Sequence, residues 1–116
     1  MPIGKDYWAD KMKDCLLKES EVKKRVKEIL TDAEAYWFCP SASMYGRAGI
    51  ADFFGCISGK SIAVEAKSEA RGVKGLSKFQ KNERDEFVKA GGTFFCVHNH
   101  ATLSEMKDKL LKITAE

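Results

Sequence analysis

The sequence has little of what marks several classes of protein. Proline occurs only 2 times in 116 residues, and there is no low-complexity stretch or internal repeat, which argues against a disordered or collagen-like chain. No apolar run approaches the roughly 20 residues that span a bilayer, and the first residues lack the unbroken apolar stretch of a secretory signal. We therefore expect a soluble protein of the cytoplasm, with no membrane partner.

Cysteine pairs and excess charge are also scarce. The 4 cysteines are Cys15, Cys39, Cys56 and Cys96, and no two of them form a Cys-x-x-Cys pair, which argues against a structural zinc site. The last three lie in apolar stretches, so we expect them to be reduced core residues. Because 20 Lys and Arg stand against 17 Asp and Glu, for a formal net charge of +3, any surface that binds nucleic acid must be local.

What is present is enough apolar sequence for one folded domain. At 116 residues and 44% hydrophobic residues, the chain has the size of a single domain, 1–116, with a core of about 19–113. Hydrophobic periodicity predicts helices over 7–17, 21–32 and 77–90, a last helix from 102, and strands over 35–39, 51–57, 61–67 and 93–97. This order of elements predicts an α/β fold.

The last two helices have predicted caps and buried faces. The first of them should be capped near Ser77 and should turn Phe79, Phe87 and Val88 towards the core. The second should open with the capping box Thr102-x-x-Glu105. Its expected inward residues are Leu103, Met106, Leu110 and Ile113.

Three charged side chains stand on predicted strands that are otherwise mostly apolar. Asp52 is at the head of one strand, and Glu65 and Lys67 are at the end of the next. Residues two apart on a strand point to the same face, so Glu65 and Lys67 project together. Taken as a pair alone, they would be an ordinary surface ion pair of little energetic value.

The turn between the two strands decides whether Asp52 joins this pair. A two-residue turn, Ser58-Gly59, places Asp52 opposite Glu65 on the same face. A three-residue turn places Phe53 there instead and sends Asp52 to the other face, unless a bulge such as one at Gly55 restores the register. The sequence alone leaves both registers open.

If the two carboxylates converge, they suit a divalent cation. Mg²⁺ and Mn²⁺ prefer hard oxygen ligands, keep several waters and bind phosphate oxygens well. An ammonium group such as that of Lys67 can position or help deprotonate an attacking water, and it can offset negative charge on a phosphate in the transition state. The three residues therefore point to phosphodiester hydrolysis.

The ordered set of motifs resembles a known nuclease superfamily. The segments Gly49-Ile50-Ala51-Asp52 and Glu65-Ala66-Lys67, with a strand-turn-strand spacer, resemble the PD-(D/E)xK nucleases. The chain is more closely similar to the VRR-NUC branch, the virus-type replication-repair nuclease domain. The further matching features are Glu21 on the preceding helix, the glycine-rich approach 45–49, and Gln80 on the helix after the lysine.

The similarity covers about residues 19–97 and departs from the family pattern at one position. Ala51 stands where the family usually carries Pro before the Asp, which removes a backbone restraint but no ligand. The Asp…Glu-x-Lys pattern alone is weak, because many sequences meet it by chance. The strength of the resemblance lies in the order of the motifs and in the matching element types.

The resemblance implies a restriction-endonuclease-like core, with a mixed central sheet flanked by helices. The site residues that it implies are Asp52, Glu65 and the Ala66 carbonyl as metal ligands, Lys67 as the catalytic lysine, Gln80 as a supporting residue and Glu21 as an acid beside the metals. Because Glu19 stands two residues before Glu21, which of the two is the helix acid stays open.

Basic and aromatic residues near the motif are candidates for contact with DNA. Arg47, in the glycine-rich loop, is a candidate phosphate contact, and Tyr45 can stack on a base. A further basic set comprises Arg71, Lys74, Lys78 and Lys81, for which a solvated helix face is the alternative because acidic residues follow at once. The basic run 23–27 is expected to be a solvated face.

These expectations combine into a Mg²⁺- or Mn²⁺-dependent DNA endonuclease. Similar stand-alone members of the branch suggest a homodimer acting on branched DNA such as four-way (Holliday) junctions, with a viral or phage origin and a place in the host-cell cytoplasm. One alternative is a module with the same fold that binds DNA without cutting it. Another is an interaction protein whose helix 7–17 and aromatic strands form a subunit interface.

Overall fold

In the computed structural model, residues 16–40 and 48–115 are described here. The elements are α2 (Glu19–Asp32), β1 (Tyr36–Phe38), β2 (Phe53–Ile57), β3 (Lys60–Ala66), the 3₁₀ turn η1 (Gly72–Gly75), α4 (Lys78–Lys89), β4 (Thr93–Val97) and α5 (His100–Ala115). The predicted helix 7–17 lies almost entirely outside the described residues. None of the helices in the described ranges combines the length and apolar character that crossing a membrane requires.

The four strands form one mixed sheet in the order β1-β2-β3-β4. β1 and β2 are antiparallel, as are β2 and β3, whereas β3 and β4 are parallel. Parallel neighbours need a crossover connection, and α4 provides it here. The predicted α/β class and the mixed sheet flanked by helices are therefore confirmed.

The hairpin between β2 and β3 settles the register that the sequence left open. Ile57 pairs with Lys60, so the turn has two residues, Ser58-Gly59. Both turn residues have positive φ, 49° and 80°, as in the type I′ turn whose twist fits a hairpin. Extending this register by one residue beyond the ladder places Asp52 opposite Glu65.

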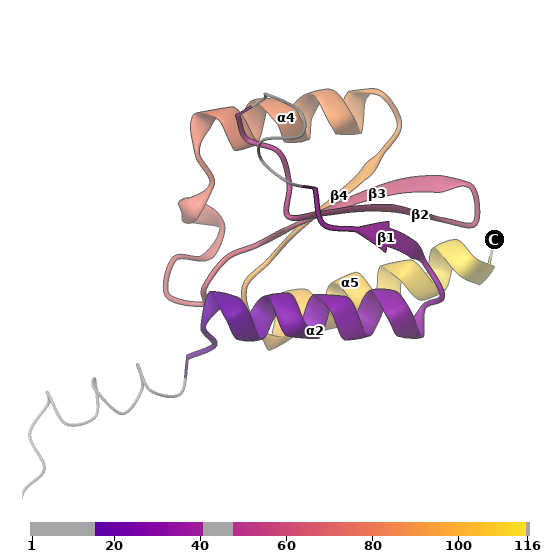
Figure 1. The fold of residues 1–116 in the computed structure, drawn as a ribbon, viewed down its shortest axis with the longest axis horizontal. Coiled ribbons are helices and arrows are strands. Elements are labelled where there is room, and N and C mark those ends of the chain that lie inside the picture. The colour runs from indigo at the N-terminus through magenta and orange to yellow at the C-terminus, as the bar shows by residue number, and fades with distance from the viewer. Residues whose placement is uncertain (1–15, 41–47, 116) are drawn as a thin grey trace, which may run out of the picture.

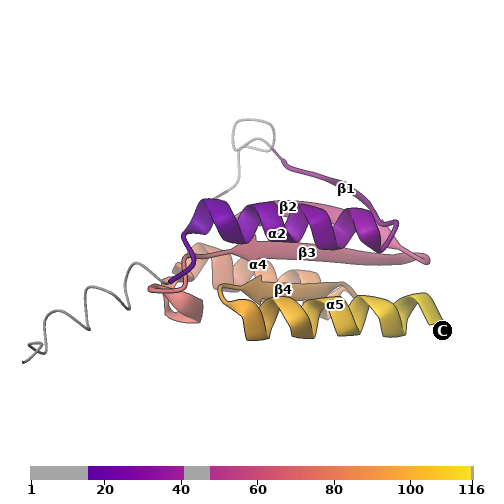
Figure 2. The same cartoon turned by 90° about the horizontal axis from the view of Figure 1, so that it is seen from below.

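The helices cover the two faces of the sheet unequally. α4 lies over one face, and α2 and α5 lie over the other (Figure 1). Turned by 90°, the molecule shows α2 and α5 side by side along their face (Figure 2). The largest fully buried side chains all belong to this second face and its helices: Phe53, Leu30, Ile62, Met106, Leu110, Val22, Val26, Val64 and Val97.

α5 confirms its predicted buried face but begins earlier than expected. Leu103, Met106, Leu110 and Ile113 are all buried. The cap lies three residues before the predicted box: Asn99 Oδ1 accepts a hydrogen bond from the Thr102 N–H (2.8 Å), and Thr102 Oγ1 accepts one from the Asn99 N–H (3.1 Å). Thr102 is thus the third residue of the helix and not its cap, because Asn99 is a preferred N-cap residue and its side chain accepts from the Thr102 N–H.

The predicted buried face of α4 is wrong for two of its three residues. Phe79 is 61% exposed and Val88 is 51% exposed, and no residue of α4 is buried. Only Phe87 packs on the sheet, with its ring 5.8 Å from that of Phe54. α4 covers the sheet face that carries charged side chains, so its first turn is held by polar contacts and not by an apolar stripe.

The cysteines are also less buried than expected. Cys39 and Cys56 are exposed and Cys96 is partly buried, while Cys15 lies outside the described residues. Cys39 follows the short edge strand β1, and Cys56 alternates away from the core side of β2, on which Phe53 and Ile57 lie. The prediction that these cysteines are core residues is therefore wrong, because alternate residues of a strand face opposite sides of the sheet even when their sequence neighbours are apolar.

Candidate active site

Asp52 lies directly before β2, where the ladder between β2 and β3 ends. The last paired residues are Phe53 and Val64, and the next rung is replaced by a side chain: the Ala66 N–H donates to Asp52 Oδ2 at 2.9 Å. In an antiparallel pair the N–H and C=O of one residue point to the same edge, so the Ala66 carbonyl also faces the Asp52 side. The two strands part here, where the Asp52 carboxylate lies beside that of Glu65.

Glu65 is a buried carboxylate with one oxygen bound and one free. Its exposed fraction is 3%. Oε1 accepts a hydrogen bond from Gln80 Nε2 at 2.9 Å and lies 3.3 Å from Lys67 Nζ. Oε2 is buried and has no hydrogen-bond partner, which costs about 1–3 kcal/mol or more when nothing compensates it. A cation at this oxygen would remove that cost.

Gln80 holds the Glu65 side chain and caps α4 at the same time. Its Oε1 accepts from the Ser77 N–H (2.9 Å), and its backbone N–H donates to Ser77 Oγ (3.1 Å). This capping box fixes the amide so that its nitrogen faces Glu65. The helix start and the buried carboxylate are therefore one connected unit, a link that the sequence suggested only through the family resemblance.

Two ionisable groups on the α4 face of the sheet, Glu65 and Cys96, have raised pKa values. Burial, and then the neighbouring Asp52 carboxylate, raise the pKa of Glu65 from its ordinary 4.5 to about 7, against the opposite effect of Lys67. Cys96 pairs with Glu65 across β3 and β4, and burial and Glu65 raise the pKa of its thiol. A protonated thiol is a poor nucleophile, so Cys96 does not supply the chemistry of this site.

Gly49 brings the Asp52 segment against the first turn of α4. Its φ is +83°, and a Cβ at this position would lie 2.4 Å from the backbone carbonyl carbon of Phe79 and 2.7 Å from the Gln80 nitrogen. Only glycine fits such a close approach and such a φ. The glycine-rich approach in the sequence thus has a structural reason, because it places Asp52 and Gln80 on one site.

Lys23 links Asp52 to an acid of α2, Glu19. Lys23 Nζ lies 3.5 Å from Glu19 Oε2 and 3.8 Å from Asp52 Oδ1. Glu21 is exposed, and no described contact joins it to Asp52 or Glu65. The role of Glu21 stays a prediction, whereas Lys23, which was expected on a solvated face, is a side chain of α2 that contacts Asp52.

The remaining predicted residues divide into those on exposed surface and those outside the described chain. Arg71, Lys74, Lys78 and Lys81 are exposed on η1 and α4 and the residues beside them, on the side of the sheet to which Glu65 points. Arg47 and Tyr45 lie outside the described residues.

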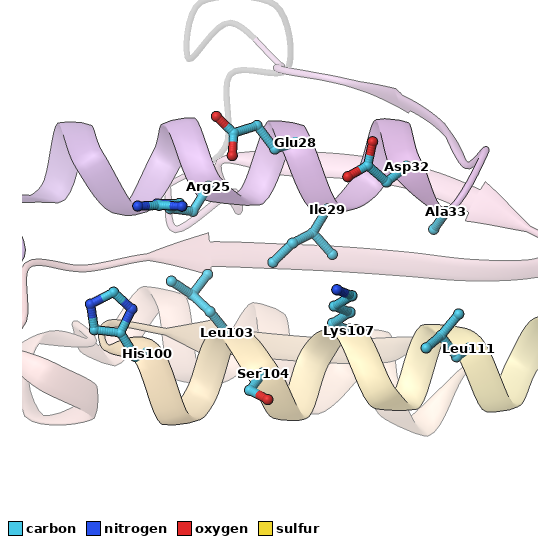
Figure 3. Close-up of a pocket in the computed structure, with 10 residues that line it drawn as sticks. All are labelled: Arg25, Glu28, Ile29, Asp32, Ala33, His100, Leu103, Ser104, Lys107 and Leu111. Carbon is cyan, nitrogen blue, oxygen red and sulfur yellow. The ribbon is translucent and has the colours of Figure 1, made fainter.

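A separate groove lies on the opposite face, between α2 and α5. It has a volume of about 360 Å³ and is lined by side chains of both signs, among them Arg25, Glu28, Asp32 and Lys107, around the apolar Ile29. Figure 3 shows Ile29 of α2 and Lys107 of α5 pointing toward each other across the groove. Neither Asp52 nor Glu65 lines it, so this groove is not part of the candidate site.

The donor set at Asp52 and Glu65 fits Mg²⁺ or Mn²⁺ better than a transition metal that needs nitrogen or sulfur. Within residues 16–40 and 48–115 no group of three or more His, Cys, Asp or Glu side chains is placed to hold an ion. Two carboxylates and a backbone carbonyl leave the remaining positions to water and substrate, as Mg²⁺ sites commonly do. The unpartnered Glu65 oxygen is the observation that supports such an ion.

The candidate site is identified by the arrangement of its residues and not by similarity to a known protein. This arrangement brings together Asp52 before β2, Glu65 at the end of β3, Lys67 directly after β3 and Gln80 of α4. In comparisons with known proteins, no protein-family model matches this chain, and no curated protein or solved structure is significantly similar to it.

Proposed function

We propose that this protein is a Mg²⁺- or Mn²⁺-dependent nuclease that hydrolyses phosphodiester bonds in DNA. The observation that carries the proposal is Glu65: a buried carboxylate with one oxygen held by Gln80 and Lys67 and the other without a partner, beside a second carboxylate. A buried oxygen without a hydrogen-bond partner, next to the second carboxylate of Asp52, is an arrangement that a bound cation would satisfy.

In this proposal, Asp52, Glu65 and the Ala66 carbonyl hold the ion. When bound, the ion supplies Lewis acidity to the phosphate and lowers the pKa of a water. The protein contributes a fixed geometry, because Gln80 and the Ala66 N–H already bind one oxygen of each carboxylate. Such preorganisation leaves little to rearrange when the substrate arrives.

Lys67 is the residue that acts on the reacting groups. A water oxygen forms a bond to phosphorus, the bond from phosphorus to the leaving sugar oxygen breaks, and the proton that the water loses is matched by one that the leaving oxygen gains. The Lys67 ammonium, held 3.3 Å from Glu65 Oε1 and only 7% exposed, offsets the negative charge that builds on the phosphate and orients the water. Its burial keeps this charge from being screened by solvent.

The substrate proposal rests on charge and on the family resemblance. Arg71, Lys74, Lys78 and Lys81 are exposed beside the site and suit the phosphates of a duplex. The proposal also includes the assembly and the DNA structure. We expect a homodimer that acts on branched DNA such as four-way junctions, since a dimer of this small restriction-endonuclease-like domain supplies two active sites for two strands.

Cleavage of a DNA panel tests the proposal. Linear duplex, flapped, single-stranded and four-way DNA are incubated with the purified protein in Mg²⁺, Mn²⁺ or EDTA. We expect cleavage that needs the ion, with the four-way DNA cut fastest, and a loss of at least about 100-fold in Lys67→Met.

The matched control is Lys112→Met, because Lys112 is an exposed lysine of α5 on the other face of the sheet. It should cleave like the wild type. Cleavage in EDTA, or equal cleavage by Lys67→Met, contradicts the proposal. Metal binding and DNA binding without any cleavage would instead favour the non-catalytic DNA-binding module.

A further inference from the structure

Two lysines of α2 lie beside Asp52, on the basic helix surface 23–27 that was expected to face solvent. A cavity of about 410 Å³ is lined by Lys23 and Lys27, by residues 48–53 with Asp52 among them, and by Cys39-Pro40. The two lysines stand four residues apart, so they share one face of the helix. The cavity thus places two lysine side chains around a space that Asp52, one of the carboxylates proposed to hold the ion, also lines.

Lys23 is held at Asp52 only loosely. Its Nζ lies 3.8 Å from Asp52 Oδ1 and 3.5 Å from Glu19 Oε2, and 39% of its side chain is exposed. Solvent-exposed ion pairs of this kind contribute about 0–1 kcal/mol. Lys23 can therefore leave Asp52 at small cost.

A divalent ion and Lys23 compete for the same carboxylate. When Asp52 becomes a ligand, its charge is taken up by the ion, and the ion repels the nearby ammonium. Lys23 then needs another anion, and the cavity that it shares with Lys27 is open to one. The anion that a DNA substrate brings to this place is a backbone phosphate, for which lysine is a common contact.

We propose that Lys23 and Lys27 bind a backbone phosphate next to the scissile one, and that Lys23 exchanges Asp52 for this phosphate when the ion binds. The inference rests on the proposed function, because the scissile phosphate is placed by the ion at Asp52 and Glu65. In this inference the substrate strand contacts the α2 side of the site as well as the basic residues of η1 and α4.

The first test uses Mn²⁺ alone, with no DNA, in titration calorimetry. Lys23→Gln removes the competing ammonium, so this variant should bind Mn²⁺ about threefold or more tightly than the wild type. Lys27→Gln should bind as the wild type does. Weaker or unchanged Mn²⁺ binding by Lys23→Gln overturns the exchange.

The second test measures affinity for a labelled four-way DNA by fluorescence anisotropy in Mn²⁺, with Lys67→Met as the non-cleaving parent. Lys23→Gln and Lys27→Gln should each weaken binding about three- to tenfold and lower the slope of log affinity against log salt by about one. The control is Lys24→Gln, an exposed neighbour on α2 that does not line the cavity and loses the same charge.

The outcomes separate this inference from the proposed function. If the wild type cleaves DNA but Lys23→Gln and Lys27→Gln bind it no more weakly than Lys24→Gln, only the phosphate contact is wrong. If the wild type binds the DNA in Mn²⁺ and never cleaves it, the nuclease proposal fails while both lysine effects are still measured. An absence of any DNA binding by the parent overturns the inference.

Discussion

The two faces of the sheet differ in what their buried residues do. On the α2 and α5 face, apolar side chains such as Phe53, Met106 and Leu110 are fully buried. On the α4 face, the buried residues Glu65 and Lys67 are charged, α4 itself buries no residue, and a cavity of about 470 Å³ remains between aromatic side chains of β1, β2 and α4. One face holds the fold together, and the other holds a set of charges in place.

This difference explains why the charged site can exist in so small a domain. Burying a carboxylate and leaving one of its oxygens unpaired lowers stability, and apolar burial on the opposite face offsets the loss. The β2–β3 hairpin links the two, because each strand sends alternate residues to the two faces. Stability and function are therefore expected to respond to different substitutions in the same strands and helices.

The largest loss of stability is expected from a substitution in the buried apolar face of the sheet. Leu110→Ala removes a fully buried side chain and should lower the free energy of unfolding by about 2–5 kcal/mol. Phe79→Ala, on the exposed side of α4, should change it by less than about 0.5 kcal/mol. Denaturant unfolding of both variants measures this, and equal losses would mean that α4 belongs to the core after all.

The next effect concerns the pH dependence of stability on the charged face. The pKa of Glu65 is about 7 in the folded protein against 4.5 ordinarily, so the folded state binds the extra proton between these values. Its contribution is fully present below about pH 4.5 and is lost as the pH rises through about 7. From pH 4.5 to 8 the wild type should therefore lose stability relative to Glu65→Gln, by on the order of 3 kcal/mol.

Unfolding in EDTA at a series of pH values tests this relation. Glu105→Gln, at an exposed position of α5, is the matched control and should keep a constant difference from the wild type. A constant difference for Glu65→Gln as well would show that Glu65 ionises in the folded protein as it does in the unfolded chain.

Smaller losses of stability are expected from substitutions at the start of α4, where a helix cap and the charged site share Gln80. Ser77→Ala removes the cap but leaves Gln80 Nε2 on Glu65 and should cost about 1 kcal/mol. Gln80→Leu removes the cap partner and the Glu65 donor together, so it should cost about 1 kcal/mol more and also weaken Mn²⁺ binding. If both variants have the same stability and the same Mn²⁺ affinity, then the hydrogen bond from Gln80 does not support the site.

The hairpin and the last helix were predictable because local rules decide them. Strand alternation and the apolar period identify β2, β3, β4 and the buried residues of α5, and Asp52, Glu65 and Lys67 stand out as charges in apolar strands. The register was open in the sequence, since it depends on the conformation of Ser58-Gly59 and not on composition. Once the turn is known, the placement of Asp52 follows.

Other features were not predictable because contacts between distant segments decide them. α4 has an apolar period, yet Gln80 and Gly49 dock its first turn by polar and backbone contacts, and Phe79 is left exposed. The contact of Lys23 with Asp52 depends on how α2 packs along the sheet, which brings together segments far apart in the sequence. The resemblance named Glu21 as the helix acid and left Glu19 open as the alternative, and Glu19 contacts Lys23, which also contacts Asp52.

The most direct test of the central claim is titration calorimetry of Mn²⁺ into the wild type, Asp52→Asn and Glu65→Gln, with Glu105→Gln as the control. If Asp52 and Glu65 hold one ion jointly, the wild type and the control bind Mn²⁺ and each carboxylate variant loses most of that affinity. Absence of Mn²⁺ binding by the wild type at millimolar ion, or binding that neither substitution weakens, would contradict the account.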